Sequence, residues 1–436
     1  MKKGFPRLVK SKSILIKIMW TLFTISFLII CIKQISELLE DYLSYNTVNS
    51  FDLINEIPSP FPAITICNLN PYQTEFALQY LKNISIDEFK NAGFDNFDIE
   101  LSVLMSVSQF NNSLKKQLAF DIEEILINCA FIGQPCSKND FDWYFHPTNG
   151  ICYRFNSQLP PKSTTQPGYL FGLRLELFVG NEVNMPSFVQ NAGYKIIIGN
   201  QTDLPKIGEG YMVSPGTETG FEMTRLFQSR LPEPYSACSD NTFDSEFDEA
   251  FKKLNQTYDQ ELCFTLYLQN KIIEQCKCYS PLLSPFNSFD QFKIKKPCLD
   301  AERIICALNT TKFLVNDDPK IFLLKCPSEC NKKTFGSMIS SSLYPIQPYA
   351  EKLMNNSKIS SKFLNDSLTL TKLKNSVLAV SVYYKDLYYT RSTEQAKYAR
   401  TDLISNIGGI LGLYIGNYDS ICALTSFIFN YFNLLN

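Results

Sequence analysis

The sequence predicts a membrane protein of the α+β class, with two transmembrane helices on either side of a large, disulfide-rich extracellular domain. Two apolar spans lie near the ends of the 436-residue chain, at 14–35 and 403–436. The region between them, 36–402, holds 12 of the 14 cysteines, an even number that suits disulfides in an oxidising compartment. The other two, Cys31 and Cys422, lie in the spans.

The first span has the length and flanking charges of a retained transmembrane helix. Residues 14–35 would form a helix of about 33 Å, at about 1.5 Å per residue. A signal peptide is the alternative, but no small-residue cleavage site follows the apolar run. Residues 1–17 carry only basic charges, so the positive-inside rule places 1–13 in the cytoplasm. We expect a plasma-membrane protein with two spans in the lipid bilayer and both termini cytoplasmic.

The region 36–402 has the composition of an extracellular domain. It holds all seven Asn-x-Ser/Thr sequons, which are candidate glycosylation sites: Asn83, Asn111, Asn200, Asn255, Asn309, Asn355 and Asn365. A net charge of −2, with no basic tract, argues against a nucleic-acid partner, and no cofactor is indicated. The single histidine, His146, follows Trp143, Tyr144 and Phe145, which favours packing over proton sensing.

Periodicity within this region predicts helices and strands that do not alternate as βαβ units. Residues 75–130 and 346–375 are expected to be helical, as is 243–275. The runs GLRLELFV and YKIIIG, and residues 377–389, are expected to be strands. This order favours an antiparallel sheet in an α+β fold.

The second span differs from a simple anchor because it contains one acidic residue, Asp419. A carboxylate at membrane depth is costly, about 2.5–3.5 kcal/mol on insertion scales, and is a candidate for an ion path. Gly408, Gly412 and Gly416 recur every four residues, so they share one face of a helix and allow close packing. We expect these glycines, together with Gly409, to lie where the pore helices meet. Simple pairing with the first span is the alternative.

From FPAITICNLNPY (61–72) onward the chain resembles the epithelial sodium channel/degenerin/acid-sensing channel family. The resemblance continues through CAFIGQPC, TNGICYRFN, LPEPYSAC, CKC, CPSEC and LISNIGGILGLYIG, in the family's order. It implies a trimer whose subunits each have a β-sheet palm, a β-ball, and a helical finger and thumb. It also implies six disulfides: Cys67–Cys152, Cys129–Cys136, Cys238–Cys330, Cys263–Cys326, Cys276–Cys306 and Cys278–Cys298. A zinc cluster at the CxC and CxxxC pieces is the alternative, disfavoured by the single histidine.

The resemblance also assigns pore residues. It implies a filter at Gly416, Asn417 and Tyr418, where the tyrosine replaces the family's serine. A ring of three Asp419 carboxylates would attract cations. Alternatively, Asp419 pairs at the interface or is protonated. Ser405 falls where the family needs a small side chain for closure. Glu37, Glu40, Asp41 and Asp402 either concentrate cations near the membrane or form an ordinary solvated rim.

These features predict a voltage-independent, amiloride-sensitive-type sodium channel subunit that conducts Na⁺ with two further subunits, as a homotrimer or heterotrimer. Gating would be by an extracellular ligand such as a peptide, by protons or by force, or the channel would need no trigger. A non-conducting or regulatory surface receptor is the alternative, favoured by Tyr418. An enzyme is not expected, because no nucleophile elbow, HExxH or phosphate loop occurs. No metal site is predicted.

Overall fold

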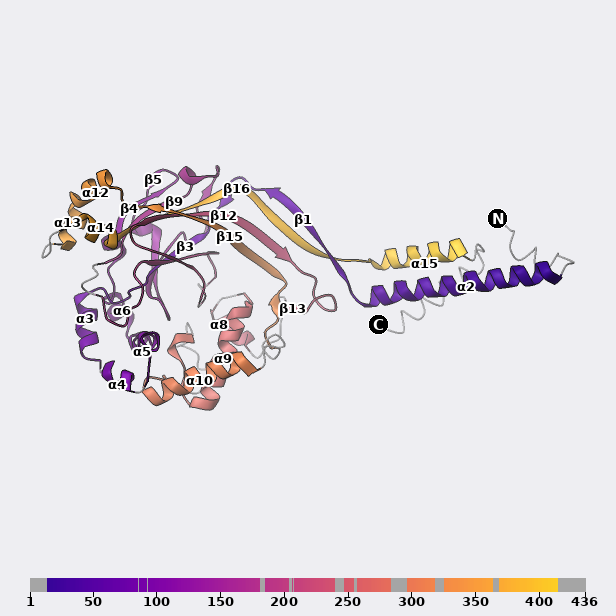
Figure 1. Ribbon diagram of the computed structural model, residues 1–436, viewed down its shortest axis with the longest axis horizontal. Helices are drawn as coiled ribbons and strands as arrows, with labels where there is room; N and C mark the ends of the chain where they lie inside the picture. Colours follow the sequence, from indigo (N-terminus) through magenta and orange to yellow (C-terminus); the bar gives the residue numbers. More distant parts are fainter. Residues whose placement is uncertain are drawn as a thin grey trace. The chain divides into compact units, whose positions relative to one another are not determined.

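The computed structural model describes residues 14–414, except 85, 92, 181–184, 204–205, 207, 240–246, 255–256, 284–295, 318–324 and 364–367 (Figure 1). The chain divides into two compact units. Unit 1 consists of Met1–Phe51, Ser229–Cys238 and Ser392–Asn436, and unit 2 consists of Asp52–Gln228 and Ser239–Arg391.

Unit 1 contains two helices, α2 (Ile14–Leu43) and α15 (Arg400–Tyr414). The stretch Lys17–Leu43 of α2 is long and apolar enough to cross a membrane, with a mean hydropathy of 1.9. This helix continues eight residues past the predicted boundary at 35, because Ser36–Leu43 has no Gly or Pro to end it. The predicted second span begins in α15, and its remainder, 415–436, lies outside the described residues.

A seven-stranded sheet forms one layer of unit 2, in the order β15-β12-β16-β9-β4-β5, with β1 also paired to β16. The strands alternate sides as a half-buried sheet requires: Leu173, Leu175 and Leu177 are buried, while Arg174 is exposed between them. Their bounds are β1 (Thr47–Asn55), β4 (Leu126–Phe131), β5 (Gln134–Pro135), β9 (Leu173–Phe178), β12 (Thr217–Ser229), β15 (Asn331–Leu343) and β16 (Val377–Ala396).

A five-stranded sheet has the order β11-β10-β3-β7-β6. Its members are β3 (Ala63–Asn68), β6 (Phe141–His146), β7 (Gly150–Phe155), β10 (Tyr194–Gly199) and β11 (Tyr211–Val213). Two short ribbons complete the strands: β2 (Ser59–Pro60) with β8 (Ser163–Thr164), and β13 (Cys238–Ser239) with β14 (Ser328–Glu329). One hydrophobic cluster contains residues of both large sheets, such as Ile66 and Ile196 with Leu175 and Val380. The core of unit 2 therefore lies between the two sheets.

Two of the sequence motifs lie side by side in the five-stranded sheet. FPAITICNLNPY forms β3 and TNGICYRFN forms β7, and these strands pair with Cys67 opposite Cys152. The two cysteines form a disulfide with a Cα–Cα separation of 4.3 Å. Gly150 has a φ of +71°, and a Cβ there would lie 2.5 Å from the Cβ of Pro71. The glycine is needed both for the turn and for this contact.

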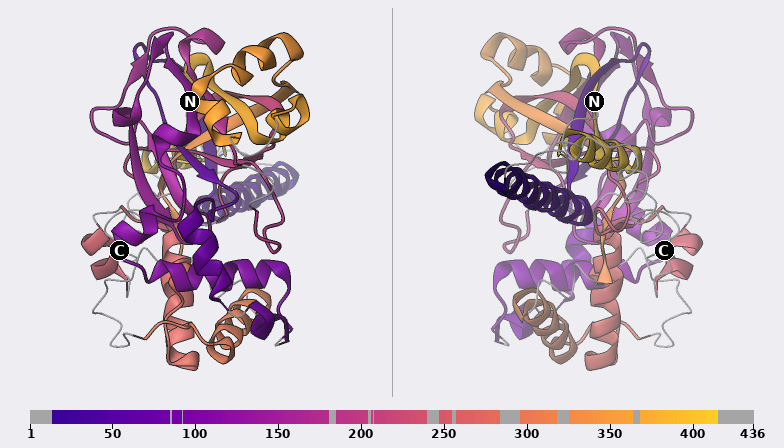
Figure 2. Two further views of the ribbon diagram at one scale, coloured as in Figure 1. Left: turned by 90° about the vertical axis from the view of Figure 1, so that its left-hand side faces the viewer. Right: turned by 90° about the vertical axis from the view of Figure 1, so that its right-hand side faces the viewer.

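The helices of unit 2 fall into three groups. The first group is α3 (Glu75–Lys82), α4 (Ile86–Asn91), α5 (Asn96–Ser108), α6 (Asn112–Lys116) and α7 (Ile122–Ile125). The second is α8 (Asp248–Leu254), α9 (Gln260–Cys276), the short η4 (Pro281–Leu283) and α10 (Ala301–Asp317), in which α9 and α10 run next to each other (Figure 2). The third, α12 (Gln347–Met354), α13 (Ser357–Ser360), the short η5 (Ser361–Phe363) and α14 (Leu370–Ser376), gathers at one end of the larger sheet (Figure 1).

The predicted mixed α+β, disulfide-rich domain is confirmed, and its antiparallel pairs include β9 with β16 and β3 with β10. The predicted strands at 172–179, 194–199 and 377–389 are present, the last extended to Ala396. The expected helical run 75–130 ends at Ile125, because β-branched and aromatic residues follow and form β4. The helix α10 was not predicted, because it lies in a cysteine-dense section.

A buried arginine joins three strands of unit 2. The side chain of Arg225 on β12 is 1% exposed, and its guanidinium pairs with Glu56, directly after β1. Its Nη2 donates to the carbonyl of Leu387 on β16 at 3.2 Å and to the Ser59 hydroxyl at 3.1 Å. The ring of Tyr384, also on β16, lies 4.9 Å from the guanidinium carbon. These contacts compensate for removing a charge from water.

The two partners of this ion pair should differ in their contribution to stability. Glu56→Ala leaves the buried guanidinium without a carboxylate, and we expect a loss of about 3 kcal/mol, the lower end of the range for breaking a buried pair. Arg225→Met leaves a carboxylate that is 37% exposed and remains hydrated, so the loss should be smaller. Thermal unfolding of the purified protein measures both, with exposed Glu351→Ala as the control. A larger loss for Arg225→Met than for Glu56→Ala would contradict this asymmetry.

Candidate functional site

The helix pair of unit 1 packs through one face of α15. Leu403, Ile407 and Leu411 recur every four residues and are buried at 4%, 2% and 1% exposure. They cluster with Cys31 of α2, which is the free cysteine among the described residues. Tyr414 extends this contact, since its ring centroid lies 5.7 Å from that of Phe27. The seam between the two helices is therefore lined by large apolar side chains.

The predicted small residues of α15 lie outside this seam. Ser405, Gly409 and Gly412 are exposed in the single chain, and Gly408 is half-buried. A Cβ built on any of the three glycines would meet no atom within 4 Å. The alternative in which the glycines pair the two spans is thus wrong for Gly408, Gly409 and Gly412, because bulkier residues make that contact.

The filter residues predicted by the resemblance, Gly416, Asn417, Tyr418 and Asp419, lie outside the described residues. The acidic positions near the helix ends are described, and three of the four have partners. Asp41 pairs with Lys397 at 2.5 Å, and Glu37 with Lys33 at 3.7 Å. The carboxylate of Asp402 accepts a hydrogen bond from the backbone N–H of Ala399. These carboxylates are partly neutralised or hydrogen-bonded rather than forming a free acidic rim.

A junction within unit 1 connects its three chain segments, and the sequence did not reveal it. One oxygen of Glu394 accepts from the hydroxyl of Thr47 at 2.8 Å, and the other accepts from the backbone N–H of Leu231 at 2.9 Å. The rings of Tyr45 and Tyr235 meet edge to face, with centroids 5.5 Å apart. Each pair joins residues far apart in sequence. Only the LPEPYSAC motif, which contains Leu231 and Tyr235, hinted at this site.

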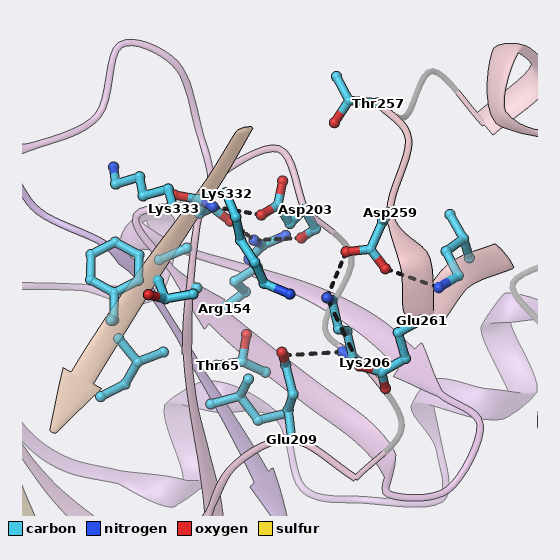
Figure 3. A pocket seen from close by; sticks show the side chains of 18 of the residues that line it. Thr65, Arg154, Asp203, Lys206, Glu209, Thr257, Asp259, Glu261, Lys332 and Lys333 are labelled. Atoms are coloured by element: carbon cyan, nitrogen blue, oxygen red, sulfur yellow. Dashed lines mark hydrogen bonds and ion pairs between the residues drawn. The ribbon is translucent and has the colours of Figure 1, made fainter. Parts of the chain in front are cut away.

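Unit 2 contains a cavity of about 450 Å³ between the five-stranded sheet, the start of α9 and β15 (Figure 3). Acidic and basic side chains share its wall. Lys206 lies between the carboxylates of Asp259, at 2.6 Å, and Glu261, at 3.9 Å. Its backbone N–H also donates to Glu209 at 3.4 Å. On the sheet side, Arg154 donates to the backbone carbonyl of Asp203 at 2.9 Å.

Burial and neighbouring charges shift the pKa values of these groups. Desolvation raises the pKa of Glu261 from its usual value of 4.5 to about 6, although Lys206 opposes the shift. Desolvation likewise raises the pKa of Glu209. Burial alone would lower the pKa of Lys206, but the charge and hydrogen bond of Asp259 outweigh it, so that pKa is raised. The cavity therefore holds one carboxylate, Glu261, that takes up a proton at mildly acidic pH, and a second, Glu209, whose pKa is raised.

His146 lines the same cavity and is 1% exposed. Its Nδ1 accepts from the backbone N–H of Thr148 at 3.3 Å and lies 3.1 Å from the side-chain amide of Asn149. The ring is thus anchored to the turn between β6 and β7. This arrangement agrees with the packing role expected from its aromatic neighbours.

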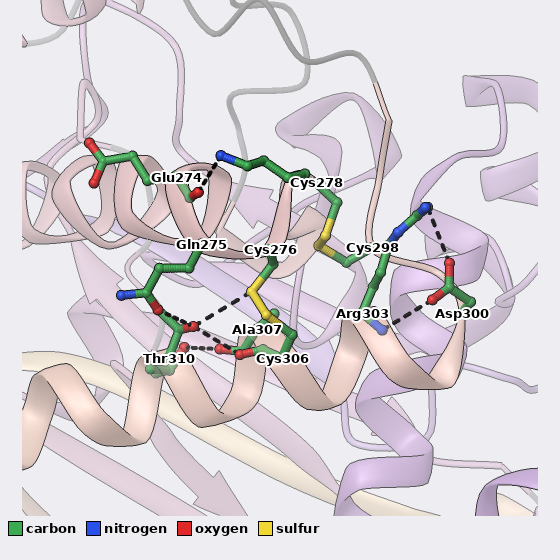
Figure 4. The surroundings of a disulfide bond; sticks show 12 residues. Glu274, Gln275, Cys276, Cys278, Cys298, Asp300, Arg303, Cys306, Ala307 and Thr310 are labelled. Carbon is green, nitrogen blue, oxygen red and sulfur yellow. Dashed lines mark hydrogen bonds and ion pairs between the residues drawn. A yellow bond between two sulfur atoms is a disulfide. The ribbon is translucent and has the colours of Figure 1, made fainter.

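The structure joins five of the expected cysteine pairs, which are Cys67–Cys152, Cys129–Cys136, Cys263–Cys326, Cys276–Cys306 and Cys278–Cys298. Cys238 and Cys330 are also disulfide-bonded. Cys276 and Cys306 link α9 to α10, and Cys278–Cys298 closes the segment that follows α9 (Figure 4). Because the CxC and CxxxC sulfurs are all in bridges, the zinc-cluster alternative for these pieces is wrong.

The candidate glycosylation sites differ in exposure. Asn83, Asn111, Asn309 and Asn355 are exposed, whereas Asn255 and Asn365 lie outside the described residues. Asn200 is half-buried in the wall of the 450 Å³ cavity, and its amide donates to the carboxylate of Asp203 at 2.6 Å. Its accessibility to a glycosyltransferase is therefore lower than that of the exposed four.

Protonation of Glu261 should appear as a pH dependence of stability. Its pKa in the folded protein, about 6, exceeds its usual value of 4.5, so the folded state binds the proton first. Stability gained from this group therefore increases as pH falls from 7 to 5. We expect Glu261→Gln to lose that gain in thermal unfolding measured across this range, while the exposed Glu302→Gln keeps it. Equal pH profiles for wild type and Glu261→Gln would contradict the assignment.

Comparison with known proteins agrees with this architecture. The family model described as "Amiloride-sensitive sodium channel" matches residues 2–417. The chain is 26% identical to the epithelial sodium channel subunit beta of Bos taurus, over 73% of this chain and 49% of that protein. It is 26% identical to acid-sensing ion channel 2 of Danio rerio, over 91% and 74%, and 25% identical to acid-sensing ion channel 1 of Gallus gallus, over 92% and 76%.

The chain thus spans about half the length of the bovine subunit. A weaker likeness, with a TM-score of 0.37 at 10% identity, covers 95% of this chain and 98% of the cryo-EM structure of a proton-activated chloride channel. The family match extends over nearly all of the sequence and includes both helices of unit 1. The chain therefore belongs to the amiloride-sensitive sodium channel family, which is a family of membrane ion channels and not of enzymes.

Proposed function

We propose that this chain is a pore-forming subunit of a voltage-independent sodium channel in the plasma membrane. In this proposal, 1–13 is cytoplasmic, 14–35 is the first span, 36–402 is extracellular, and 403–436 forms the second span and the pore. Two further subunits complete a trimer, and Na⁺ is the permeant ion.

The observation that carries the proposal is the division of α15 into two faces. Large residues, Leu403, Ile407 and Leu411, pack on α2. Ser405, Gly408 and Gly412 are centred about 130° away around the helix, at about 100° per residue. A helix that presents glycine and serine away from its own partner is suited to close contact with other copies. Three copies around an axis would bring these small residues together.

Exposed apolar side chains in unit 2 support assembly. The outer strand β15 carries Met338, Ile339 and Leu343 at 51%, 50% and 78% exposure, and Leu53 on β1 is 75% exposed. A strand at the edge of a sheet with such residues favours association. Pairing of these surfaces with neighbouring copies would remove the apolar side chains from water. This burial would stabilise the trimer through contacts outside the membrane.

Asp419 gives the proposed pore its charge preference. Three copies would place three carboxylates near the filter Gly416-Asn417-Tyr418, and no Lys, Arg or His occurs from 403 to 436 to oppose them. Such a ring attracts cations and repels anions. The competing proposal, a non-conducting receptor, rests on Tyr418 in place of a small residue. Recordings from cells that express the chain separate the two.

Enlarging the proposed closure position should hold the pore open. Ser405→Val introduces a branched side chain on the small face of α15, so the helices can no longer approach fully. We expect an increased basal current in whole-cell recordings. Ser405→Ala, which keeps the residue small, should behave as wild type. An unchanged basal current for Ser405→Val would remove support for this assignment.

Neutralising the proposed charge ring should alter permeation. Asp419→Asn removes three carboxylates per trimer, and we expect a lower Na⁺ selectivity, measured as a shift of reversal potential under bi-ionic conditions. Asp52→Asn removes an exposed carboxylate of unit 2 and serves as the matched control. Identical reversal potentials for Asp419→Asn and wild type would contradict the role of Asp419. Absence of current in every form would favour the receptor alternative.

A further inference from the structure

Unit 2 contains a second cavity, of about 420 Å³, separate in its lining from the cavity around Lys206. Helix α5 forms one wall, and η4 with α10 forms the opposite wall, while residues of β10 and β11 complete it. On α5 the lining residues Phe97, Leu101 and Met105 recur every four residues and share one face. The volume lies within the range of pockets that hold small organic molecules, about 300–1,000 Å³.

The cavity is apolar inside and open at its rim. Met105, Ala307 and Leu282 line it and are 1%, 4% and 9% exposed. Phe97 and Met212 also line it but are 58% and 67% exposed. This gradient identifies a buried floor and an accessible mouth. An apolar body that enters would bury surface against the floor and would also cover the two exposed side chains.

One carboxylate in this wall has no partner. Glu100 is half-buried on α5, beside Leu101, and its side-chain carboxylate has no hydrogen-bond or ion-pair partner among the residues that the structure describes. Desolvation raises its pKa from 4.5 to about 7, and no cation acts against that shift. The buried hydroxyl of Tyr72 is close enough for the charge of Glu100 to raise the pKa of the tyrosine.

The cation in the wall is influenced by a different acid. Lys195 on β10 is 9% exposed, and burial lowers its pKa, while the charge of Glu209 opposes that shift. Glu209 belongs to the lining of the first cavity. The net shift of the Lys195 pKa is nevertheless downward, so Glu209 offsets only part of the effect of burial. The lining of the second cavity therefore contains one carboxylate, on Glu100, and one ammonium, on Lys195.

We propose that this cavity binds an amphiphilic organic cation, with its ammonium group on Glu100 and its apolar body between α5 and α10. An ammonium would supply the charge partner that Glu100 lacks, and the floor would take the hydrocarbon part. The ligand would bridge helices that belong to two separate groups in the fold. Binding here does not require conduction, so this proposal and the proposed channel function can fail independently.

The test uses tryptamine, which is an apolar ring system with one ammonium, and tryptophol, its uncharged hydroxyl counterpart. Isothermal titration calorimetry on the purified full-length protein in lipid nanodiscs measures both affinities at pH 8. We expect tryptamine to bind wild type at least tenfold more tightly than tryptophol. Glu100→Gln should reduce the affinity for tryptamine at least tenfold and leave tryptophol unchanged. Glu351→Gln, on α12 and away from the cavity, is the control.

The pH dependence of the tryptamine affinity is a second measurement. This affinity would not change with pH in the predicted way if Glu100 had only a structural role. With a pKa of about 7, the ionised fraction of Glu100 rises about tenfold from pH 6 to pH 8, so tryptamine affinity should rise by about that factor. The facing titratable groups are Tyr72 and Lys195 on β10, while Ser280, directly before η4, and Thr311 on α10 add hydroxyls to the lining. Tryptophol should show no such trend.

Leu101→Trp, which fills the space between the two walls, should abolish binding of both compounds. If that variant does not fold, the near-isosteric Glu100→Gln still decides the question. The proposal is overturned if wild type fails to bind tryptamine at millimolar concentration, or if tryptophol binds as tightly as tryptamine. It is also overturned if Glu100→Gln retains the wild-type affinity for tryptamine.

Discussion

The buried guanidinium of Arg225 is the constraint around which the larger sheet of unit 2 is built. A charge that is 1% exposed requires fixed partners, and they come from two places in the sequence: Glu56 with Ser59, and Leu387. These residues can meet only when β1, β12 and β16 have their native register. Lys333, whose pKa is lowered by burial and by the charge of Arg225, lies near the same centre. The cluster therefore specifies strand arrangement as well as contributing to stability.

The strands of this cluster are neighbours of the unit 1 helices in the sequence. In the sequence, β1 follows α2 and β16 precedes α15, so the strands tied by Arg225 continue directly toward the two helices of unit 1. Within unit 1, Glu394 at the end of β16 holds Thr47 of β1 and the backbone of Leu231. The disulfide that joins α9 to α10 keeps these two helices as a single rigid pair.

The sequence predicted secondary structure best where a local hydrophobic pattern alone determines it. Alternation in GLRLELFV predicted β9, and the apolar run at 14–35 predicted the first helix of unit 1. The helix α10 was missed because the cysteines of the surrounding section, 276–330, dominated its interpretation. The roles of Arg225 and Glu394 were not predictable, because their partners lie more than 160 residues away in the chain and only the folded sheet brings them together. Glu100 was missed for a related reason. A carboxylate on a helix is usually solvated, and only the folded chain shows that residues distant in sequence desolvate this one.

If the chain forms a channel as proposed, the small-residue face of the second membrane helix lines an aqueous path. Cysteine accessibility tests this most directly: single cysteines at Ser405, Gly408 and Gly412, and at Leu403, Ile407 and Leu411, would be exposed to a membrane-impermeant thiosulfonate reagent during recording. We expect modification to change the current at the first three positions and to leave it unaffected at the last three. Reaction at Ile407 and Leu411, with protection at Ser405 and Gly412, would contradict a pore lined by the small-residue face.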